Sequence, residues 1–465
     1  MNIRPGLSVL VLGLGESGLA MARWCARQGA RLRVADSRAA PPGLAALRSH
    51  APEAEIVLGD FRTALLDGVE VVAVSPGLDA RIGVLVEARR RGIAQVGEMA
   101  LFSGALDALG ARARTRILAI TGTNGKTTTT SLTAAIARAA GCDAVAAGNI
   151  SPAALSVLLE RLDQDRSLPD CWVLELSSFQ LETPHGLAAE AATVLNVSDD
   201  HLDRHGDMAA YAATKAHVFD GDGVQVVNRQ DAQVMAMAQP GRRVISFGID
   251  SAPGGTDFGI VQAVDGAWLA QGDQHLLPLS ALNIAGLHNA ANVLAALALG
   301  TAIGLPRAPM LAGLTSFRGL PHRVEAVARR SDDVVFYDDS KGTNVGATLA
   351  ALAGLGRPVV LIAGGDGKGQ DFSPLHAAVA HHARAVVLIG RDAGRIEAAL
   401  AGAGAMIERA ADMDVAVARA AALALPGDAV LLSPACASLD MFRNYTHRAE
   451  VFVAAVRRLP QVSAP

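Results

Sequence analysis

Residues 117–128, ILAITGTNGKTT, decide the fold of this chain. The first five are apolar or β-branched, which predicts a buried strand, and GTNG predicts a tight turn before a helix that begins at Lys126. Backbone N–H groups in such a turn, together with the helix N-terminus, hold phosphates. The stretch predicts a phosphate loop that binds ATP, in which Lys126 neutralises phosphate oxygens and Thr127 binds Mg²⁺. It departs from the spacing GxxxxGK[ST] at Ile120, which takes the place of the first glycine.

Short apolar runs alternate with alanine-rich helical stretches on both sides of this loop, which is typical of α/β domains with largely parallel sheets. We expect three domains: a Rossmann-like N-terminal domain in residues 1–104, a central P-loop-type ATPase domain in residues 105–319, and a C-terminal Rossmann-like α/β domain in residues 320–465. Residues 103–116, rich in glycine, alanine and arginine, predict a linker. The expected strands are residues 8–12, 31–36, 69–75, 117–121, 172–177, 192–197, 224–228, 243–248, 334–339, 358–365, 385–390 and 429–434.

The composition is that of a soluble globular protein. Of 465 residues, 51% are hydrophobic and 18% are charged, the net charge is −4, and the arginines are scattered, which argues against a nucleic-acid surface. The apolar run near the N-terminus is too short to cross a membrane and leads into a glycine loop, so we expect a buried strand and no membrane insertion. Four widely separated cysteines indicate neither a disulfide framework nor a zinc site, which favours the cytoplasm. Nothing in the sequence requires more than a monomer.

A second glycine loop, Gly13–Gly18 (GLGESG), follows the first expected strand and opens a helix, and Asp36 ends the next strand. This spacing predicts a diphosphate held at a helix N-terminus, from a dinucleotide or from a nucleotide sugar. Two alternatives stay open. The glycines can serve only the close packing of strand and helix, and Ser75–Gly77, which would line the same crevice, can be an ordinary turn.

Lysine is rare in this chain, with four lysines against 37 arginines. Lys126, Lys215, Lys341 and Lys368 lie in TGTNGKTT, AATKAHVF, DDSKGTN and GGDGKGQDF, each a segment with other chemically active side chains. An ammonium is compact and can lose its proton, whereas a guanidinium is planar and always charged. The pattern indicates positions at which arginine would fail; the alternative is chance placement in an arginine-rich chain.

These segments, together with several others, resemble the Mur ligases of peptidoglycan synthesis. The matching segments are AITGTNGKTT (119–128), GNI (148–150), ELSSFQLE (175–182), DDHLDRHG (199–206), YAATK (211–215), LPHR (320–323), DDSKGTN (338–344), GGDGKGQDFS (364–373) and LLSPACASLDMFRNY (431–445). The resemblance covers nearly the whole chain and implies an ATP-dependent amide ligase. It implies that ATP phosphorylates the carboxylate of UDP-N-acetylmuramoyl-L-alanine and that the amine of D-glutamate then attacks the acyl phosphate.

The resemblance also implies two Mg²⁺ ions. Thr127 and Glu175 would bind the first, while His201 and Lys215, the latter carbamylated by CO₂, would support the second. Lys126, His201 and Lys215 are the expected catalytic residues. Three plainer interpretations stay open from the residues alone: Glu175 caps the turn that follows it, His201 lies in a solvated turn, and Lys215 is an exposed helix lysine.

The binding residues that the resemblance implies fall into three groups. The expected ATP site comprises Gly122, Thr123, Asn124, Gly125, Lys126, Thr127, Thr128, Asn289, Asn292, Arg323 and Asp339. The expected UDP-substrate site comprises Gly15, Glu16, Ser17, Asp36, Ser37, Arg38, Ser75, Pro76, Gly77, Asn149, Ser177 and Gln180. The expected glutamate site comprises Lys341, Thr343, Lys368, Ser438, Leu439 and Tyr445.

Some of these assignments have alternatives or departures. Asn289 and Asn292, three residues apart on a helix, can also be a polar helix start. Tyr445 stands where the family commonly has phenylalanine, and Ala449 stands where it commonly has glycine.

Three other functions fit parts of the sequence. Folylpolyglutamate synthase shares the central and C-terminal architecture but has no reason to carry Gly13–Gly18. An NAD-dependent oxidoreductase would explain only that glycine loop, and a nucleotide-gated binding protein would use only the phosphate loop. For a ligase we expect the C-terminal domain to close about a hinge near residues 319–322.

Overall fold

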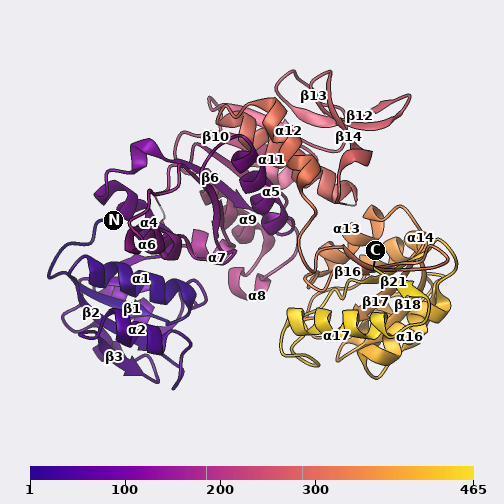
Figure 1. Ribbon diagram of the computed structural model, residues 1–465. Helices are drawn as coiled ribbons and strands as arrows, with labels where there is room; N and C mark the ends of the chain where they lie inside the picture. The colour runs from indigo at the N-terminus through magenta and orange to yellow at the C-terminus, as the bar shows by residue number, and fades with distance from the viewer. Residues whose placement is uncertain (185, 285, 465) are drawn as a thin grey trace.

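The computed structural model describes residues 1–184, 186–284 and 286–464. These residues form three α/β bodies, each built on its own sheet, which confirms the expected fold class. In Figure 1 the central body, coloured purple to salmon, lies between the indigo N-terminal body and the orange and yellow C-terminal body. The sheets follow one another along the chain without exchanging strands.

The first sheet is parallel, with the strand order β3-β2-β1-β4-β5. Chain connections leave β1 and β4 in opposite directions, and at such a switch point the loops after the two strands border a crevice. β1 ends directly before the glycine loop, and β4 ends directly before Ser75. The elements are β1 (Ser8–Leu12), α1 (Glu16–Arg27), β2 (Arg31–Asp36), α2 (Leu44–His50), β3 (Glu55–Leu58), η1 (Thr63–Leu66), β4 (Val71–Val74), α3 (Gly83–Arg90), β5 (Ala94–Val96) and α4 (Glu98–Ala108).

The linker expected at residues 103–116 is wrong for its first part, because residues 103–108 belong to α4. All residues of α4 from Glu98 to Leu106 are buried, in a core shared by the first sheet and the central body, so its small residues serve close packing. A Cβ atom on Gly104, for example, would lie 2.0 Å from the carbonyl oxygen of Met1. The predicted domain boundary at residue 104 lies inside α4 and stays a prediction.

The central sheet has nine strands, in the order β14-β13-β12-β11-β10-β9-β6-β8-β7. β6 pairs in parallel with both β8 and β9, which brings the carboxyl ends of these three strands to one edge. The antiparallel strands β12–β14, which project at the upper right in Figure 1, are not predicted from the sequence. The strands are β6 (Arg116–Thr121), β7 (Ala144–Gly148), β8 (Cys171–Glu175), β9 (Ala191–Val194), β10 (Val224–Asn228), β11 (Val244–Phe247), β12 (Phe258–Ala263), β13 (Gly266–Gln271) and β14 (Gln274–Pro278).

Helices cover the central sheet on both faces. They are η2 (Arg112–Arg114), α5 (Lys126–Ala139), α6 (Ala154–Asp163), α7 (Ser178–Leu181), α8 (Leu202–His205), α9 (Met208–Ala216), η3 (His217–Phe219), α10 (Ala232–Ala236), η4 (Leu279–Ala281), α11 (Leu287–Ala302) and α12 (Arg307–Ser316). No helix in the described part of the chain is long and apolar enough to cross a bilayer.

The third sheet has the order β19-β18-β17-β20-β16-β15-β21, with β15 and β21 antiparallel to their neighbours. The four strands expected here are present as β16, β17, β18 and β20. The elements are β15 (Glu325–Arg330), β16 (Val335–Asp338), α13 (Val345–Gly354), β17 (Val359–Gly364), α14 (Leu375–His382), β18 (Ala383–Ile389), α15 (Ala393–Ala399), β19 (Met406–Arg409), α16 (Met413–Leu423), β20 (Ala429–Leu432), α17 (Tyr445–Arg457) and β21 (Val462–Ser463).

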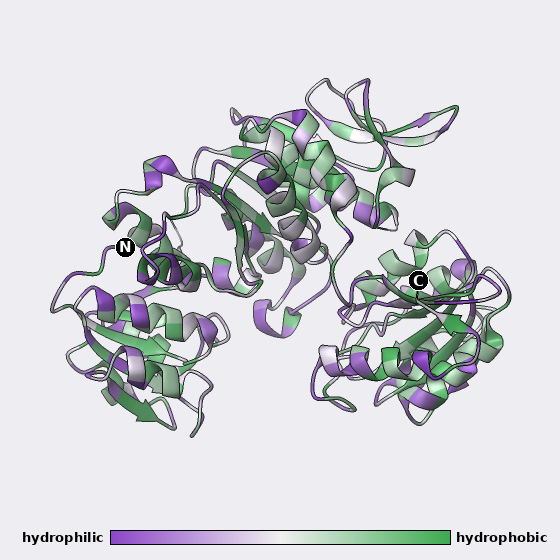
Figure 2. Cartoon of the chain, viewed as in Figure 1, coloured by the Kyte–Doolittle hydropathy of each residue, from purple (hydrophilic) through white to green (hydrophobic). Residues whose placement is uncertain are grey.

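Apolar residues gather in the strands and on the helix faces that cover them, as the green strands in Figure 2 show. In the central body α5 packs beside α11 and α12, and Leu132, Ile136, Leu294 and Leu297 are almost fully buried there. Burying one such side chain contributes about 1.5–3 kcal/mol. This packing holds the helix that begins at the phosphate loop.

Candidate active site

The phosphate loop connects β6 to α5 as expected. Gly125 has φ +85°, a conformation that favours glycine, and a Cβ atom there would lie 2.4 Å from Oδ1 of Asn292. The Lys126 ammonium donates to the carbonyl oxygens of Gly122 and Thr123, both at 2.8 Å, so the side chain folds back over its own loop. Burial lowers the pKa of Lys126, because a desolvated ammonium is less stable.

The two asparagines of α11 lie against this loop. Both are buried, and Asn292 Oδ1 accepts a hydrogen bond from the Thr129 hydroxyl at 3.2 Å. Asn292 in turn donates to Asn289 Oδ1 at 3.2 Å. They are therefore packing partners of the phosphate-loop helix, and a contact with adenine stays a prediction.

Glu175, at the end of β8, presents an unsatisfied carboxylate oxygen. Its side chain is 2% exposed; Oε1 accepts a 2.6 Å hydrogen bond from the Asn149 amide, while Oε2 is buried without a hydrogen-bond partner among the described residues. The capping interpretation of Glu175 is wrong, because Ser177 caps α7 by accepting from the backbone N–H of Gln180. A buried carboxylate oxygen without a donor is costly, and a divalent cation would satisfy it.

Lys215 is buried in α9, so the interpretation as an exposed helix lysine is wrong. The side chain is 1% exposed, and its ammonium donates to the Gly122 carbonyl oxygen at 3.0 Å and lies 4.3 Å from the Tyr211 ring centroid. The same carbonyl accepts from Lys126, so two lysines meet on one oxygen. Burial, and then the charge of Lys126, hold the pKa of Lys215 well below its usual range. The amine is thereby poised to lose its proton.

His201 is held by ring packing. It has φ +55°, and its ring lies edge-on to the Phe179 ring, with the two ring centroids 4.8 Å apart. Its Nε2 is 3.6 Å from a carboxylate oxygen of Asp200. Phe179 also contacts the Arg204 guanidinium, 4.4 Å from the ring centroid. Burial lowers the pKa of His201, which favours the neutral imidazole that binds metals. His201 is thus a half-buried, packed residue in a turn.

The C-terminal body reaches the phosphate loop. The Arg323 guanidinium donates to the Thr127 hydroxyl at 2.6 Å, and the Asn344 amide donates to Asn124 Oδ1 at 3.2 Å. Asp339 is buried behind these contacts and accepts from the Ser433 hydroxyl at 2.7 Å. Burial raises the pKa of Asp339 to about 7.

Within the expected glutamate site the structure brings Lys341 and Tyr445 together, with the ammonium 3.8 Å from the ring centroid. Lys368 is exposed and has φ +51°, and its positive charge contributes to the lowered pKa of His201. Thr343 is half-buried, Ser438 is buried, and Leu439 is 73% exposed. Ala449 is fully buried within α17, where alanine favours the helix more than glycine would.

Hydrogen bonds join the loops that border the N-terminal crevice. Asp36 Oδ2 accepts from the Leu14 backbone N–H at 2.6 Å, and Arg38 binds the same carboxylate with two side-chain hydrogen bonds. Arg38 lowers the pKa of Asp36 to about 2. Ser75 donates to the Gly13 carbonyl oxygen at 3.1 Å. A Cβ atom on Gly18 would lie 1.8 Å from that carbonyl oxygen, so close packing requires glycine at this position, whereas a Cβ atom on Gly15 would meet nothing within 4 Å. The binding of a diphosphate by this loop stays a prediction.

Two residues expected in this crevice turn their side chains away from it, toward the contact between the N-terminal and central bodies. Glu16 accepts from the Ser151 hydroxyl and the Ala153 backbone N–H, and Ser17 donates to Glu98. At the first turn of α1 this leaves backbone N–H groups for a ligand. Ser37 is exposed beside Asp36.

A cavity of about 240 Å³ lies between the N-terminal and central bodies. Three of the expected substrate residues line it: Ser75 and Pro76 from the first body and Gln180 from α7. Apolar side chains from β4 and α3 form one wall, and Phe179, Thr183 and Pro184 contribute to the other. Gly77 is exposed and follows Pro76 in the chain.

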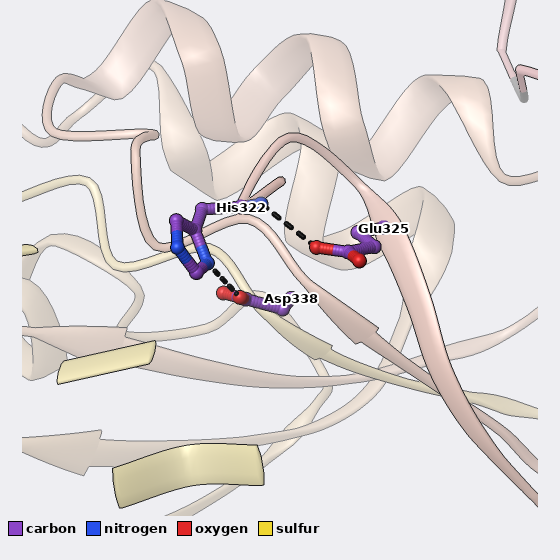
Figure 3. Close-up of side chains that lie close together, drawn as sticks. All are labelled: His322, Glu325 and Asp338. Atoms are coloured by element: carbon purple, nitrogen blue, oxygen red, sulfur yellow. Dashed lines mark hydrogen bonds and ion pairs between the residues drawn. The ribbon is translucent and has the colours of Figure 1, made fainter. Parts of the chain in front are cut away.

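A side-chain cluster at the start of the C-terminal body, drawn in Figure 3, is not predicted from the sequence. His322 Nδ1 lies 2.6 Å from Oδ2 of the buried Asp338, and the His322 backbone N–H donates to Glu325 at 3.0 Å. The only sequence signal is that His322 precedes Arg323 and Asp338 precedes Asp339. Glu98 and Tyr211 are missed too, since a buried glutamate and a buried tyrosine have no local signature.

The residues around the phosphate loop fit Mg²⁺. The free Glu175 oxygen and the Thr127 hydroxyl are hard oxygen ligands of the kind that Mg²⁺ prefers. The neutral His201 imidazole offers a nitrogen ligand. Lys215 as an amine is a poor ligand for Mg²⁺ and would have to become an oxygen anion to contribute.

Three family models match the chain in the order of the three bodies. The Mur ligase MurD-like N-terminal domain matches residues 7–97, the Mur ligase middle domain residues 120–300, and the Mur ligase glutamate ligase domain residues 322–436. Solved structures of distant members share the fold. The UDP-N-acetylmuramate-alanine ligase of Thermotoga maritima aligns over 97% of this chain and 99% of its own, with TM-score 0.58 and 18% identity. A pseudomurein peptide ligase type C of Methanothermus fervidus covers 96% and 99%, with TM-score 0.56 and 17% identity.

Curated relatives are much more similar in sequence. The UDP-N-acetylmuramoylalanine–D-glutamate ligase of Aromatoleum aromaticum is 66% identical over 100% of both chains. The protein of the same name from Ralstonia nicotianae is 56% identical over 97% of both chains. The chain therefore belongs to the Mur ligase family.

Proposed function

We propose that this chain joins D-glutamate to UDP-N-acetylmuramoyl-L-alanine in peptidoglycan precursor synthesis, with ATP converted to ADP and phosphate. Full-length relatives at 66% and 56% identity carry the name of this ligase, and all three Mur ligase domains are matched in order. The observation that carries the proposal is the meeting of Lys126 and Lys215 on the Gly122 carbonyl of the phosphate loop. A loop that serves ATP binding alone has no use for the second, buried lysine.

The reaction gathers negative charge, because a carboxylate must approach a triphosphate. Lys126 would neutralise the phosphate oxygens, and Arg323 would approach them from the C-terminal body. Thr127 and Glu175 would hold a Mg²⁺ ion, which supplies charge neutralisation at the phosphates. The substrate carboxylate takes the γ-phosphoryl group, the amine of glutamate attacks the acyl carbon, and phosphate leaves with the carboxyl oxygen.

We further propose that Lys215 reacts with CO₂. The neutral amine attacks the carbon atom, a proton is lost, and the resulting carbamate carries one negative charge. The burial that lowers the pKa of Lys215 supports this proposal, since only the free amine is a nucleophile. With His201, the carbamate would hold a second Mg²⁺.

The substrates would occupy the two outer bodies. The UDP group would lie at Gly15–Ser17, Asp36–Arg38 and Ser75–Gly77, with Asn149, Ser177 and Gln180 guiding the muramoyl-alanine arm toward ATP. The two carboxylates of glutamate match the two ammonium groups of Lys341 and Lys368. Thr343, Ser438, Leu439 and Tyr445 would complete that site. We propose a cytoplasmic monomer with domains at 1–104, 105–319 and 320–465.

Phosphate release tests the proposed function. The protein is incubated with Mg²⁺, ATP, UDP-N-acetylmuramoyl-L-alanine and D-glutamate, and each is omitted in turn. We expect release only with all components, and L-glutamate should not replace D-glutamate. Release that continues without either acceptor would reject the ligase in favour of a nucleotide-driven switch, and absence of release with all components present would reject it outright.

A further inference from the structure

Helix α6 begins without a side-chain cap of its own. Its N-cap residue is Ala153, which has no side-chain acceptor for the first N–H groups. Two carboxylates of the N-terminal body take this role: Glu98 Oε1 accepts from the Leu155 N–H at 3.1 Å, and Glu16 Oε1 accepts from the Ala153 N–H at 2.8 Å. Carboxylates are favoured at a helix N-terminus, so this contact joins the two bodies.

The same two carboxylates are also found at the start of α1, one as a hydrogen-bond acceptor and one as part of the helix. The Ser17 hydroxyl donates to Glu98 Oε2 at 3.0 Å, and Glu16 itself is the first residue of α1. Glu98 therefore bonds at once to the helix that follows the glycine loop and to α6 of the central body. It is 2% exposed, whereas Glu16 is exposed.

The turn before α6 leads to Glu175. The Gly148 N–H donates to the Pro152 carbonyl oxygen at 3.0 Å. Asn149 then donates twice to Glu175, from its backbone to the carbonyl oxygen at 2.8 Å and from its amide to Oε1 at 2.6 Å. The segment from Asn149 to the start of α6 is thus hydrogen-bonded at both ends, to Glu175 at one end and to Glu98 and Glu16 at the other.

We propose that Glu98 is a positioning residue that sets the glycine loop of the N-terminal body at a fixed place relative to Glu175. The inference rests on the proposed function, in which the substrate is held by its UDP group at one body and reacts at the other. The carboxylate of the substrate reaches ATP in the right orientation only if the N-terminal and central bodies keep a fixed position relative to each other. Small misplacements of reacting groups reduce rates strongly, by about 100-fold for 1 Å.

The shape of Glu98, rather than its charge, carries this role. Burial raises the pKa of Glu98 to about 7, and the charge of Glu16 acts in the same direction. Glutamine has the same shape and is neutral. Its carbonyl oxygen can accept from Leu155 and its amide can donate to Ser17, so Glu98→Gln is the conservative variant. Glu98→Ala removes both contacts.

Full-length wild type, Glu98→Ala and Glu98→Gln are compared by phosphate release with each substrate varied in turn. For Glu98→Ala we expect the KM for UDP-N-acetylmuramoyl-L-alanine to rise at least about 10-fold and kcat to fall by about 10- to 100-fold. The KM values for ATP and D-glutamate should stay within about 3-fold of wild type. Glu98→Gln should stay within about 3-fold for every constant.

A double variant separates positioning from helix capping. Ala153→Ser gives α6 a cap of its own, so Glu98→Ala/Ala153→Ser should recover the Tm of wild type. If Glu98 positions the loop, the KM for the UDP substrate stays raised in the double variant. Recovery of that KM along with the Tm, or a wild-type KM in Glu98→Ala, overturns the proposal while leaving the ligase function intact. A wild type without acceptor-dependent phosphate release overturns both.

Discussion

The Arg323 guanidinium donates a 2.6 Å hydrogen bond to the hydroxyl oxygen of Thr127, so the C-terminal body contacts the first turn of the phosphate-loop helix. Thr127 is the residue expected to bind Mg²⁺. Two cations beside one oxygen repel each other. We therefore expect Arg323 to leave Thr127 for the phosphates when Mg-ATP binds, which would couple nucleotide binding to motion about the hinge expected near residues 319–322.

Replacing Arg323 with alanine should lower kcat/KM for ATP by about 100-fold, because a charge-assisted contact to phosphate is lost. Arg323→Lys should retain only part of the wild-type kcat/KM for ATP, since an ammonium lacks the planar fork of donors. Steady-state kinetics with varied ATP measure both effects. The control is Arg329→Ala, which removes an exposed ion pair on β15 and should leave kcat/KM unchanged. An equal loss in both variants would show that the effect is not specific to the Thr127 contact.

Replacing Glu175 with glutamine should raise the Mg²⁺ concentration needed for half-maximal activity by at least about 10-fold, because a neutral amide is a much weaker ligand. The Tm should change little, since the lost carboxylate has one buried oxygen without a partner in the described structure. Titration of Mg²⁺ in the phosphate-release assay gives the shift. Glu160→Gln, on the exposed face of α6, serves as the matched control. An unchanged Mg²⁺ requirement in Glu175→Gln would remove this residue from the metal site.

Replacing Lys215 with methionine should abolish ligation while leaving the Tm equal to or above that of wild type. A lysine whose pKa is lowered on folding binds fewer protons in the folded state, so its burial costs stability at neutral pH. Lys215→Arg should be equally inactive, because a guanidinium cannot form the carbamate. Short carboxylic acids should restore part of the activity of Lys215→Ala by supplying the missing anion. Full activity of Lys215→Arg would contradict the carbamate.

The stability difference between Asp339→Asn and wild type should depend on pH. The pKa of Asp339 is about 7 in the folded protein, above the ordinary value of 3.8. Its contribution is therefore greatest below pH 3.8 and is lost as the pH rises to 7, because deprotonation is easier in the unfolded chain. The variant should gain up to about 4 kcal/mol relative to wild type across this range. Chemical denaturation at several pH values measures it, and a constant difference would mean that the pKa of Asp339 does not change on folding.

The phosphate loop and most strands were predictable, because glycine spacing and β-branched apolar runs act locally. β6 begins at Arg116 and α5 at Lys126, within one residue of expectation. The sequence predicts a linker over residues 103–108 of α4 because their small side chains also suit flexible segments, and only the core on both sides of α4 makes them part of a buried helix. The strands β12–β14 form through pairing with one another, which a pattern within one strand does not reveal.

The sequence by itself determined which chemical groups the chain possesses, their order, and the family they resemble. Tertiary structure alone decided that Lys215 is buried against the carbonyl of Gly122, 93 residues away, and that one oxygen of Glu175 stays free of the described donors. It also turned the side chains of Glu16 and Ser17 from the expected substrate crevice toward the contact with the central body. The reason is physical: desolvation and hydrogen-bond partners come from segments distant in sequence, and they decide whether a lysine is a surface cation or a reactive amine.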